Sequence, residues 1–141
     1  MQQPSDNRAP RFPVSIKGVI RIGPRFVLLR NERDEWELPG GKLEYGEDPP
    51  VCLAREIQEE LSLDVTVAEL IDCWLYRIVE GVEVLIVTYG TVYGGTDQPK
   101  LSTEHKEVGL FTLQEIDTLK IPPGYVRSMK RWDEMQRSKT A

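Results

Sequence analysis

Long stretches of apolar, β-branched and aromatic residues alternate with short turn-forming segments along the chain. Four of these stretches predict β-strands: Val14–Ile22, Phe26–Arg30, Val65–Val79 and Val82–Val92. Two shorter strands are predicted at Trp36–Leu38, which Pro39-Gly40-Gly41 ends, and at Val108–Thr112. The polar segment Gly94–Lys106 before the last strand predicts a loop.

Three segments have the spacing of amphipathic helices: Glu47–Leu61, Leu113–Leu119 and Pro122–Gln136. Proline is tolerated in a first helical turn, as at Pro49, and Thr112 with Glu115 forms a capping-box pattern. Tyr125 and Trp132 are seven residues apart, which indicates a buried stripe. Strands flanked by a few helices predict an α/β/α sandwich around a mixed β-sheet.

The 141 residues suit one domain, and we place it at residues 12–138 after a polar tail at residues 1–11. The net charge of −5 argues against binding to duplex nucleic acid, which needs a cationic surface. The apolar runs are too short for a membrane helix, and residues 1–13 have no signal-peptide pattern, so we expect a cytoplasmic protein. Cys52 and Cys73 fit no zinc motif and are interpreted as reduced, structural thiols.

The helix predicted at Glu47–Leu61 concentrates negative charge on one side. A helical projection puts its apolar residues on one face (Val51, Leu53, Ala54, Ile57 and Leu61) and Glu56, Glu59 and Glu60 on the other. Like charges at these spacings repel by a few tenths of a kcal/mol per pair. A hard divalent cation would compensate for this repulsion. The alternative is a solvated acidic face in which Arg55 pairs with Glu59.

The segment Pro39-Gly40-Gly41-Lys42 comes shortly before this helix. Glycines let the backbone approach a ligand closely, and free carbonyl groups can coordinate a metal. Lys42 can meet a phosphate as a point charge. Glycine pairs also occur in ordinary turns, so the segment indicates a binding site only together with the acidic helix.

Together these residues resemble the Nudix box, G-x5-E-x7-R-E-U-x-E-E-x-G-U, where U is aliphatic. The match runs from Gly41 through Glu47 and Arg55-Glu56 to Glu59-Glu60 and Leu63. The single departure is Ser62, which replaces the second glycine. The resemblance to the Nudix family extends in element order over about the whole chain.

This resemblance implies a role for each matched residue. Glu56, Glu59 and Glu60 would bind magnesium, or manganese in its place, with the Gly40 carbonyl as a further ligand. Arg55 would orient the glutamates as a catalytic residue, and Glu59 would also take part in catalysis. Structural support would come from Gly41 and Glu47, and substrate contact from Lys42. A left-handed helix end at Ser62 would cost stability without affecting catalysis.

The resemblance also places a further acid in the loop before the last strand. Glu104 and Glu107 are the candidates for a general base, and we favour Glu104; the alternative is a solvated loop. His105 is the only histidine, and we interpret it as a surface residue, although its ordinary pKa would suit a base. The aromatic residues on the predicted strands are assigned to the core in preference to stacking on a base.

The predicted function is metal-dependent hydrolysis of a phosphoanhydride bond in a nucleoside diphosphate linked to another group. Pro-Gly-Gly-Lys resembles MutT-like enzymes, which favours a nucleoside triphosphate that releases pyrophosphate. The alternative is a Nudix-fold module that binds or senses a nucleotide without turnover. The expected partner is a small nucleotide, with no duplex nucleic acid and no membrane, and the sequence leaves a homodimer open.

Overall fold

Two four-stranded sheets form the framework of the chain in the computed structural model, which describes residues 9–103, 105 and 107–140. The first sheet has the order β5-β1-β7-β6, with bounds Gly40–Lys42, Val14–Val19, Val82–Val92 and Thr66–Val79. Strands β1 and β7 run parallel, and the other two pairs are antiparallel, so this sheet is mixed as predicted.

The second sheet is antiparallel and is centred on β3 (Arg25–Arg30). Its other strands are β2 (Arg21–Ile22), β4 (Trp36–Glu37) and β8 (Glu107–Phe111). The predicted strand Val14–Ile22 is therefore divided between the two sheets, because the chain leaves β1 after Val19 and re-enters pairing at Arg21. Of the predicted tail, residues 1–8 lie outside the described residues.

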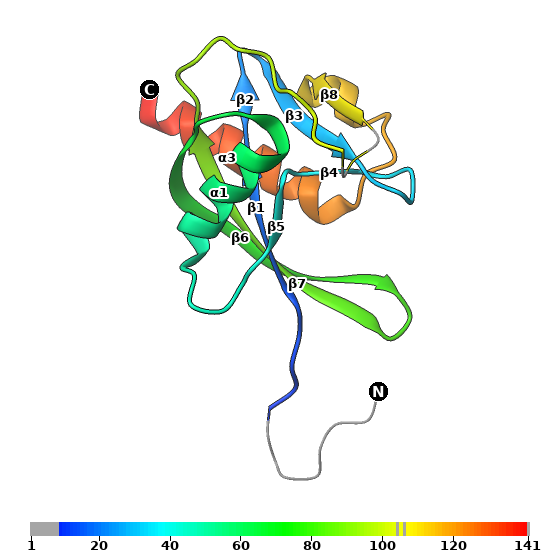
Figure 1. The fold of residues 1–141 in the computed structure, drawn as a ribbon. Helices are drawn as coiled ribbons and strands as arrows, with labels where there is room; N and C mark the ends of the chain where they lie inside the picture. Colours follow the sequence, from blue (N-terminus) through cyan, green and yellow to red (C-terminus); the bar gives the residue numbers. More distant parts are fainter. Residues whose placement is uncertain (1–8, 104, 106, 141) are drawn as a thin grey trace.

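Helices α1 (Pro49–Leu61) and α3 (Pro123–Thr140) lie on opposite sides of the first sheet (Figure 1). Side chains alternate across a strand, so Ile16 on β1 packs with α1 whereas Val19 packs with α3. A hydrophobic cluster fills each side of the sheet, and the predicted α/β/α sandwich is confirmed.

Helix α1 buries Leu53, Ile57 and Leu61 completely, as its spacing predicts. Val51 was assigned to the same face, but it is 60% exposed. Cys52 is fully buried in its place. The difference arises because Val51 lies about 160° from Leu53 in projection at 3.6 residues per turn and so faces away from the buried side of α1.

The buried stripe predicted for the terminal helix is confirmed, since Tyr125 and Trp132 are 3% and 1% exposed. The helix continues to Thr140, beyond the predicted end at Gln136. No proline or glycine follows Gln136, and Arg137 and Lys139 suit the negative end of the helix dipole. In the part of the chain described here, no helix is both long and apolar enough to cross a membrane.

Three other sequence expectations need correction. The short helix α2 is confined to Leu113–Ile116, although its capping box between Thr112 and Glu115 is present. The glycine-rich segment Gly40–Lys42 is a strand, β5, because it pairs with β1. Both cysteines are free thiols, as predicted, but Cys73 is exposed on the edge strand β6, so its interpretation as a structural thiol is wrong.

Helix α1 ends at Ser62, which adopts the left-handed conformation expected from the sequence, with φ 56° and ψ 37°. Its amide donates to the carbonyl of Gln58 at 3.0 Å. The Cβ of a non-glycine residue is disfavoured in this conformation.

We predict that Ser62→Gly raises the free energy of unfolding by a few tenths to about 1 kcal/mol. The greater freedom of glycine in the unfolded chain offsets part of the gain. Thermal or urea unfolding measures the difference. Because Ser62 contributes no carboxylate to the acidic helix, turnover per folded molecule should be unchanged, and a large change would place Ser62 in the active site.

Candidate active site

The acidic side of α1 is organised by Arg55. Its guanidinium donates to both carboxylate oxygens of Glu47, at 2.7 and 2.9 Å. The same side chain contacts Glu56 and Glu59 at 3.2 Å each. Glu47 lies before the helix, so this ion pair ties the approach loop to α1 and orders the acidic face.

Glu60 points away from this exposed group and into the protein. It is 3% exposed, and its Oε1 accepts a hydrogen bond of 3.0 Å from the Gly40 amide. Burial raises the pKa of Glu60 to about 7, although Lys17 and the Gly40 amide oppose the shift. A buried carboxylate of this kind favours a cationic partner.

Gly40 and Gly41 allow β5 to lie between β1 and α1. Gly40 has φ +146°, and a Cβ there would lie 1.9 Å from the carbonyl oxygen of Ile16. A Cβ on Gly41 would lie 2.3 Å from the carboxyl carbon of Glu56. The glycine pair therefore gives β5 its conformation and lets the Glu56 carboxylate approach the strand.

We predict that Gly41→Ala lowers turnover by at least about 10-fold, because the new methyl group displaces the Glu56 carboxylate. The free energy of unfolding should fall by about 1–3 kcal/mol, as for other overpacked positions. Steady-state kinetics and urea unfolding separate the two effects. Gly46→Ala is the matched control, since a Cβ at Gly46 meets no atom within 4 Å, although its φ of +75° adds backbone strain. Equal turnover in wild type and Gly41→Ala would contradict the inferred role of Glu56.

Two neighbouring cavities share Glu56 and Glu60 in their walls. The acidic cavity, of about 320 Å³, is lined by Glu44, Arg55, Glu56, Glu59, Glu60, Ser102 and Thr103. The inner cavity, of about 400 Å³, lies between β5, the β6–β7 hairpin and α3. Its polar part includes Lys17, Glu37 and Lys42, and its apolar part includes Ile78 and Ile86. An anionic group at this shared wall needs a cation between it and the carboxylates, while a bulky group has room in the inner cavity.

A second charged group, which the sequence analysis missed, forms the floor of the inner cavity. Glu37 on β4 contacts Lys17 on β1 at 3.5 Å and accepts a hydrogen bond of 2.8 Å from Asn31. Burial opposes the charge on Glu37, but Lys17, His105 and Asn31 lower its pKa to about 2. The signal available in the sequence was a charged residue inside each of two strands, which requires a partner when the strand is buried.

His105 belongs to this group, so its interpretation as a surface residue is wrong. Its side chain is 13% exposed, and Nε2 lies 3.2 Å from Glu37 Oε2. Nδ1 lies 3.5 Å from Glu60 Oε2, but it makes no hydrogen bond with any described residue. The hydrogen bond with Glu37 raises the pKa of His105. The fold brings this loop residue between the carboxylates of Glu37 and Glu60. The sequence does not show this contact, because the three residues are far apart along the chain.

The chemistry of the donors fits a hard divalent cation, because four carboxylates line the acidic cavity, those of Glu44, Glu56, Glu59 and the buried Glu60. Among residues 9–103, 105 and 107–140, however, no three His, Cys, Asp or Glu side chains are arranged so that they could hold a metal ion. Arg55 contacts Glu56 and Glu59, whereas Glu60 is turned toward Gly40. The residues thus fit the cation by type and location, with Arg55 as the group that competes for the carboxylates.

Of the two acids proposed as general base, the structure describes one. Glu104 lies outside the described residues. Glu107 begins β8, where its carboxylate contacts Arg30 on β3 at 3.2 Å and is 52% exposed. Glu107 lines neither the acidic cavity nor the inner cavity.

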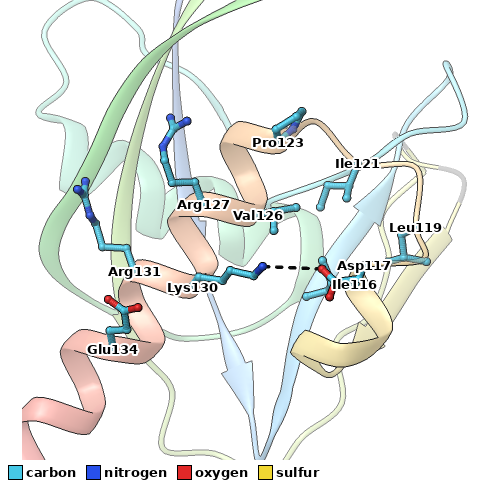
Figure 2. Close-up of a pocket in the computed structure, with 10 residues that line it drawn as sticks. All are labelled: Ile116, Asp117, Leu119, Ile121, Pro123, Val126, Arg127, Lys130, Arg131 and Glu134. Carbon is cyan, nitrogen blue, oxygen red and sulfur yellow. Dashed lines mark ion pairs between the residues drawn. The ribbon is translucent and has the colours of Figure 1, made fainter.

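A larger cavity, of about 590 Å³, lies between α2 and α3 and contains none of the residues predicted for the site (Figure 2). Ile116, Leu119 and Val126 give it an apolar floor. Lys130 points to Asp117, with 3.8 Å between the charged atoms. Size alone therefore does not identify the active site, since the titratable cluster lies elsewhere.

The chain belongs to the Nudix family, because the model of the NUDIX domain matches residues 13–132. A MutT-like protein from Streptomyces ambofaciens is 40% identical over 73 residues, which cover 50% of this chain and 47% of that protein. An 8-oxo-dGTP diphosphatase from Proteus vulgaris is 57% identical over 37 residues, or 26% of this chain and 33% of the relative. A dihydroneopterin triphosphate diphosphatase from Escherichia coli (strain K12) is 39% identical over 67 residues, or 43% and 45%. The matched part of the chain spans less than half the length of each of these relatives.

Solved structures show the same fold. The MutT protein from Methanosarcina mazei Go1 is 25% identical with a TM-score of 0.76, over 89% of this chain and 95% of that one. A C. elegans Ap4A hydrolase in a binary complex has a TM-score of 0.75 at 17% identity, over 89% and 97% of the two chains. The predicted fold family is therefore confirmed.

Proposed function

We propose that this protein is a divalent-cation-dependent hydrolase that cleaves a phosphoanhydride bond in a small molecule containing a nucleoside diphosphate. The observation that carries the proposal is the shared wall of the two cavities, where Glu56 and the buried Glu60 lie side by side on α1. A diphosphate at this wall would have an acidic, cation-attracting cavity on one side and a partly apolar cavity on the other.

The cation, Mg²⁺ or Mn²⁺, would be held by Glu56, Glu59 and Glu60, with the Gly40 carbonyl as a further ligand. When bound, it would neutralise phosphate charge and lower the pKa of the attacking water. The Arg55–Glu47 ion pair would then orient the helix and its carboxylates.

The remaining roles fall to residues around this wall. Lys42 lines the inner cavity, where its ammonium group would bind a phosphate of the substrate. Glu104 would act as the general base, since a carboxylate that binds a cation is a poor proton acceptor. Glu59 would take part in catalysis as a ligand of the cation, at the exposed end of the acidic face.

We further propose a nucleoside triphosphate as the substrate, with pyrophosphate as the product. Two of the similar proteins are named for triphosphates, 8-oxo-dGTP and dihydroneopterin triphosphate. The inner cavity supports this choice, because about 400 Å³ is in the range of small-ligand sites and Tyr76, Ile78 and Val84 offer apolar surface to a base.

The test is a panel of nucleoside triphosphates, nucleotide sugars and dinucleoside polyphosphates, each incubated with the protein in Mg²⁺ or in EDTA. Release of pyrophosphate from a triphosphate, only with the cation, is the expected result. Binding of nucleotides by calorimetry without turnover of any of them would support the alternative, a Nudix-fold sensing module. Cleavage of nucleotide sugars in preference to triphosphates would overturn the substrate but keep the reaction class.

A further inference from the structure

The loop between β7 and β8 is held at two points against the C-terminal end of α1 and at a third point against β4. The Lys100 amide donates to the Leu61 carbonyl, and the Ser102 amide donates to the Glu60 carbonyl, both at 2.9 Å. The third point is the side chain of His105, which reaches past the helix to Glu37 on β4. Among the loop residues that the structure describes, this third contact alone joins the loop to another element through side chains that face the inner cavity.

The carboxylate of Glu37, which His105 contacts, is held in place by other side chains as well. Asn31 donates to its Oε1 at 2.8 Å, while Lys17 and His105 share its Oε2 at 3.5 and 3.2 Å. The side chains of Glu37 and Lys17 are 13% and 9% exposed, so little water competes for these interactions. A group with this many partners is held in one rotamer, and whatever binds it is positioned as well.

One nitrogen of the His105 imidazole is hydrogen-bonded, and the other has no hydrogen bond to a described residue. Nε2 is engaged by Glu37, and Nδ1 faces the carboxylate of Glu60 at 3.5 Å. The ring therefore lies between one carboxylate to which it is hydrogen-bonded and a second that it approaches without a hydrogen bond.

We infer that His105 is a positioning residue, whose Nε2 hydrogen bond to Glu37 holds the β7–β8 loop on α1, beside the Glu60 carboxylate. The inference rests on the proposed function, because the reaction that it supports is the hydrolysis assigned above. His105 acts through Glu37 and the loop that this contact anchors, and it touches no reacting atom.

Two substitutions separate this role from a general loss of structure. In His105→Gln the side-chain amide nitrogen can take the place of Nε2, whereas in His105→Asn it takes the place of Nδ1 and falls short of Glu37. We expect His105→Asn to lower kcat by about 10-fold or more, as for other residues that orient a metal site, with KM changed by less than about 3-fold. His105→Gln should keep kcat within about 3-fold of wild type.

A second readout needs neither cation nor substrate. Lys100 is exposed, but its amide is hydrogen-bonded to Leu61 of α1. Trypsin can therefore cleave the peptide bond between Lys100 and Leu101 only when the loop leaves α1. Limited trypsin digestion, followed by mass spectrometry, should show faster cleavage after Lys100 in His105→Asn than in wild type or His105→Gln. Equal melting temperatures of the three proteins would confirm that the opening is local.

The outcomes are distinct. Unchanged cleavage after Lys100 in His105→Asn would overturn the inference, and so would faster cleavage without any loss of kcat. Equal losses of kcat in both variants would also overturn it, since the retained donor should rescue the loop. A wild-type protein that hydrolyses no nucleotide but shows the expected cleavage pattern would overturn the proposed function and leave the anchoring contact of His105 supported.

Discussion

Glu60→Gln is expected to lower turnover by about 100-fold or more in saturating Mg²⁺, the range found when a metal-site or acid–base group is removed. Glutamine keeps the shape of the side chain and the Oε1 acceptor for the Gly40 amide. It removes the charge that the cation would need at the wall shared by the two cavities. Kinetics over a range of Mg²⁺ concentrations measure the effect and show whether cation affinity falls with it.

The fold should survive this substitution. Burial raises the pKa of Glu60 to about 7, which shows that its charge is disfavoured in the absence of a cation. The melting temperature of Glu60→Gln in EDTA should therefore equal or exceed that of wild type. Glu134→Gln is the matched control, since it makes the same change of charge on α3, beside the cavity in Figure 2. Wild-type turnover in Glu60→Gln would reject the proposed cation site.

Glu104→Gln should reduce turnover by about 100-fold or more if Glu104 is the general base, with little change in the affinity for Mg²⁺. Glu107→Gln should have a much smaller effect. The structure supplies a reason, because Glu107 lies on β8, contacts Arg30 and lines neither cavity of the candidate site. The two residues thus form a matched pair of acids from one loop region.

The dependence of rate on pH provides a second measurement. If Glu104 accepts the proton, its replacement should remove the acidic limb of the pH–rate profile, whereas Glu107→Gln should retain that limb. Near-wild-type turnover in both single variants and in the double variant would reject a base in the loop. The role would then return to the carboxylates of α1, with Glu59 as the most exposed of them.

The position of the acidic helix could be predicted from the sequence because its information is local. Helical spacing alone placed Leu53, Ile57 and Leu61 on the buried face of α1, and the sequence pattern located its end at Ser62. The β6–β7 hairpin was equally predictable, since two β-rich stretches flank a two-residue turn. Residues close in sequence determine these features through backbone propensity and periodicity.

The assignment of Glu60 to the polar face of α1 is wrong, because Glu60 lies seven residues after Leu53, about 20° away in projection at 3.6 residues per turn, and is buried. Helical spacing could not show which group meets this carboxylate, and the structure identifies the Gly40 amide of β5. The pairing of β5 with β1 decides this, and the segment looked like a turn in the sequence because its two glycines have no strand propensity.

The sequence by itself determined the family motif, the acidic helix and its two flanking glycines, because each depends on residues within a few turns of one another. Only the tertiary structure decided that Lys17, Glu37 and His105 meet beneath the inner cavity. These residues come from β1, β4 and the β7–β8 loop, and their contacts depend on how two sheets and a loop pack. A charged residue within a buried strand indicates that a partner is needed. The packing of the elements decides which residue is the partner, because a buried charge is stable only where another element supplies an opposite charge.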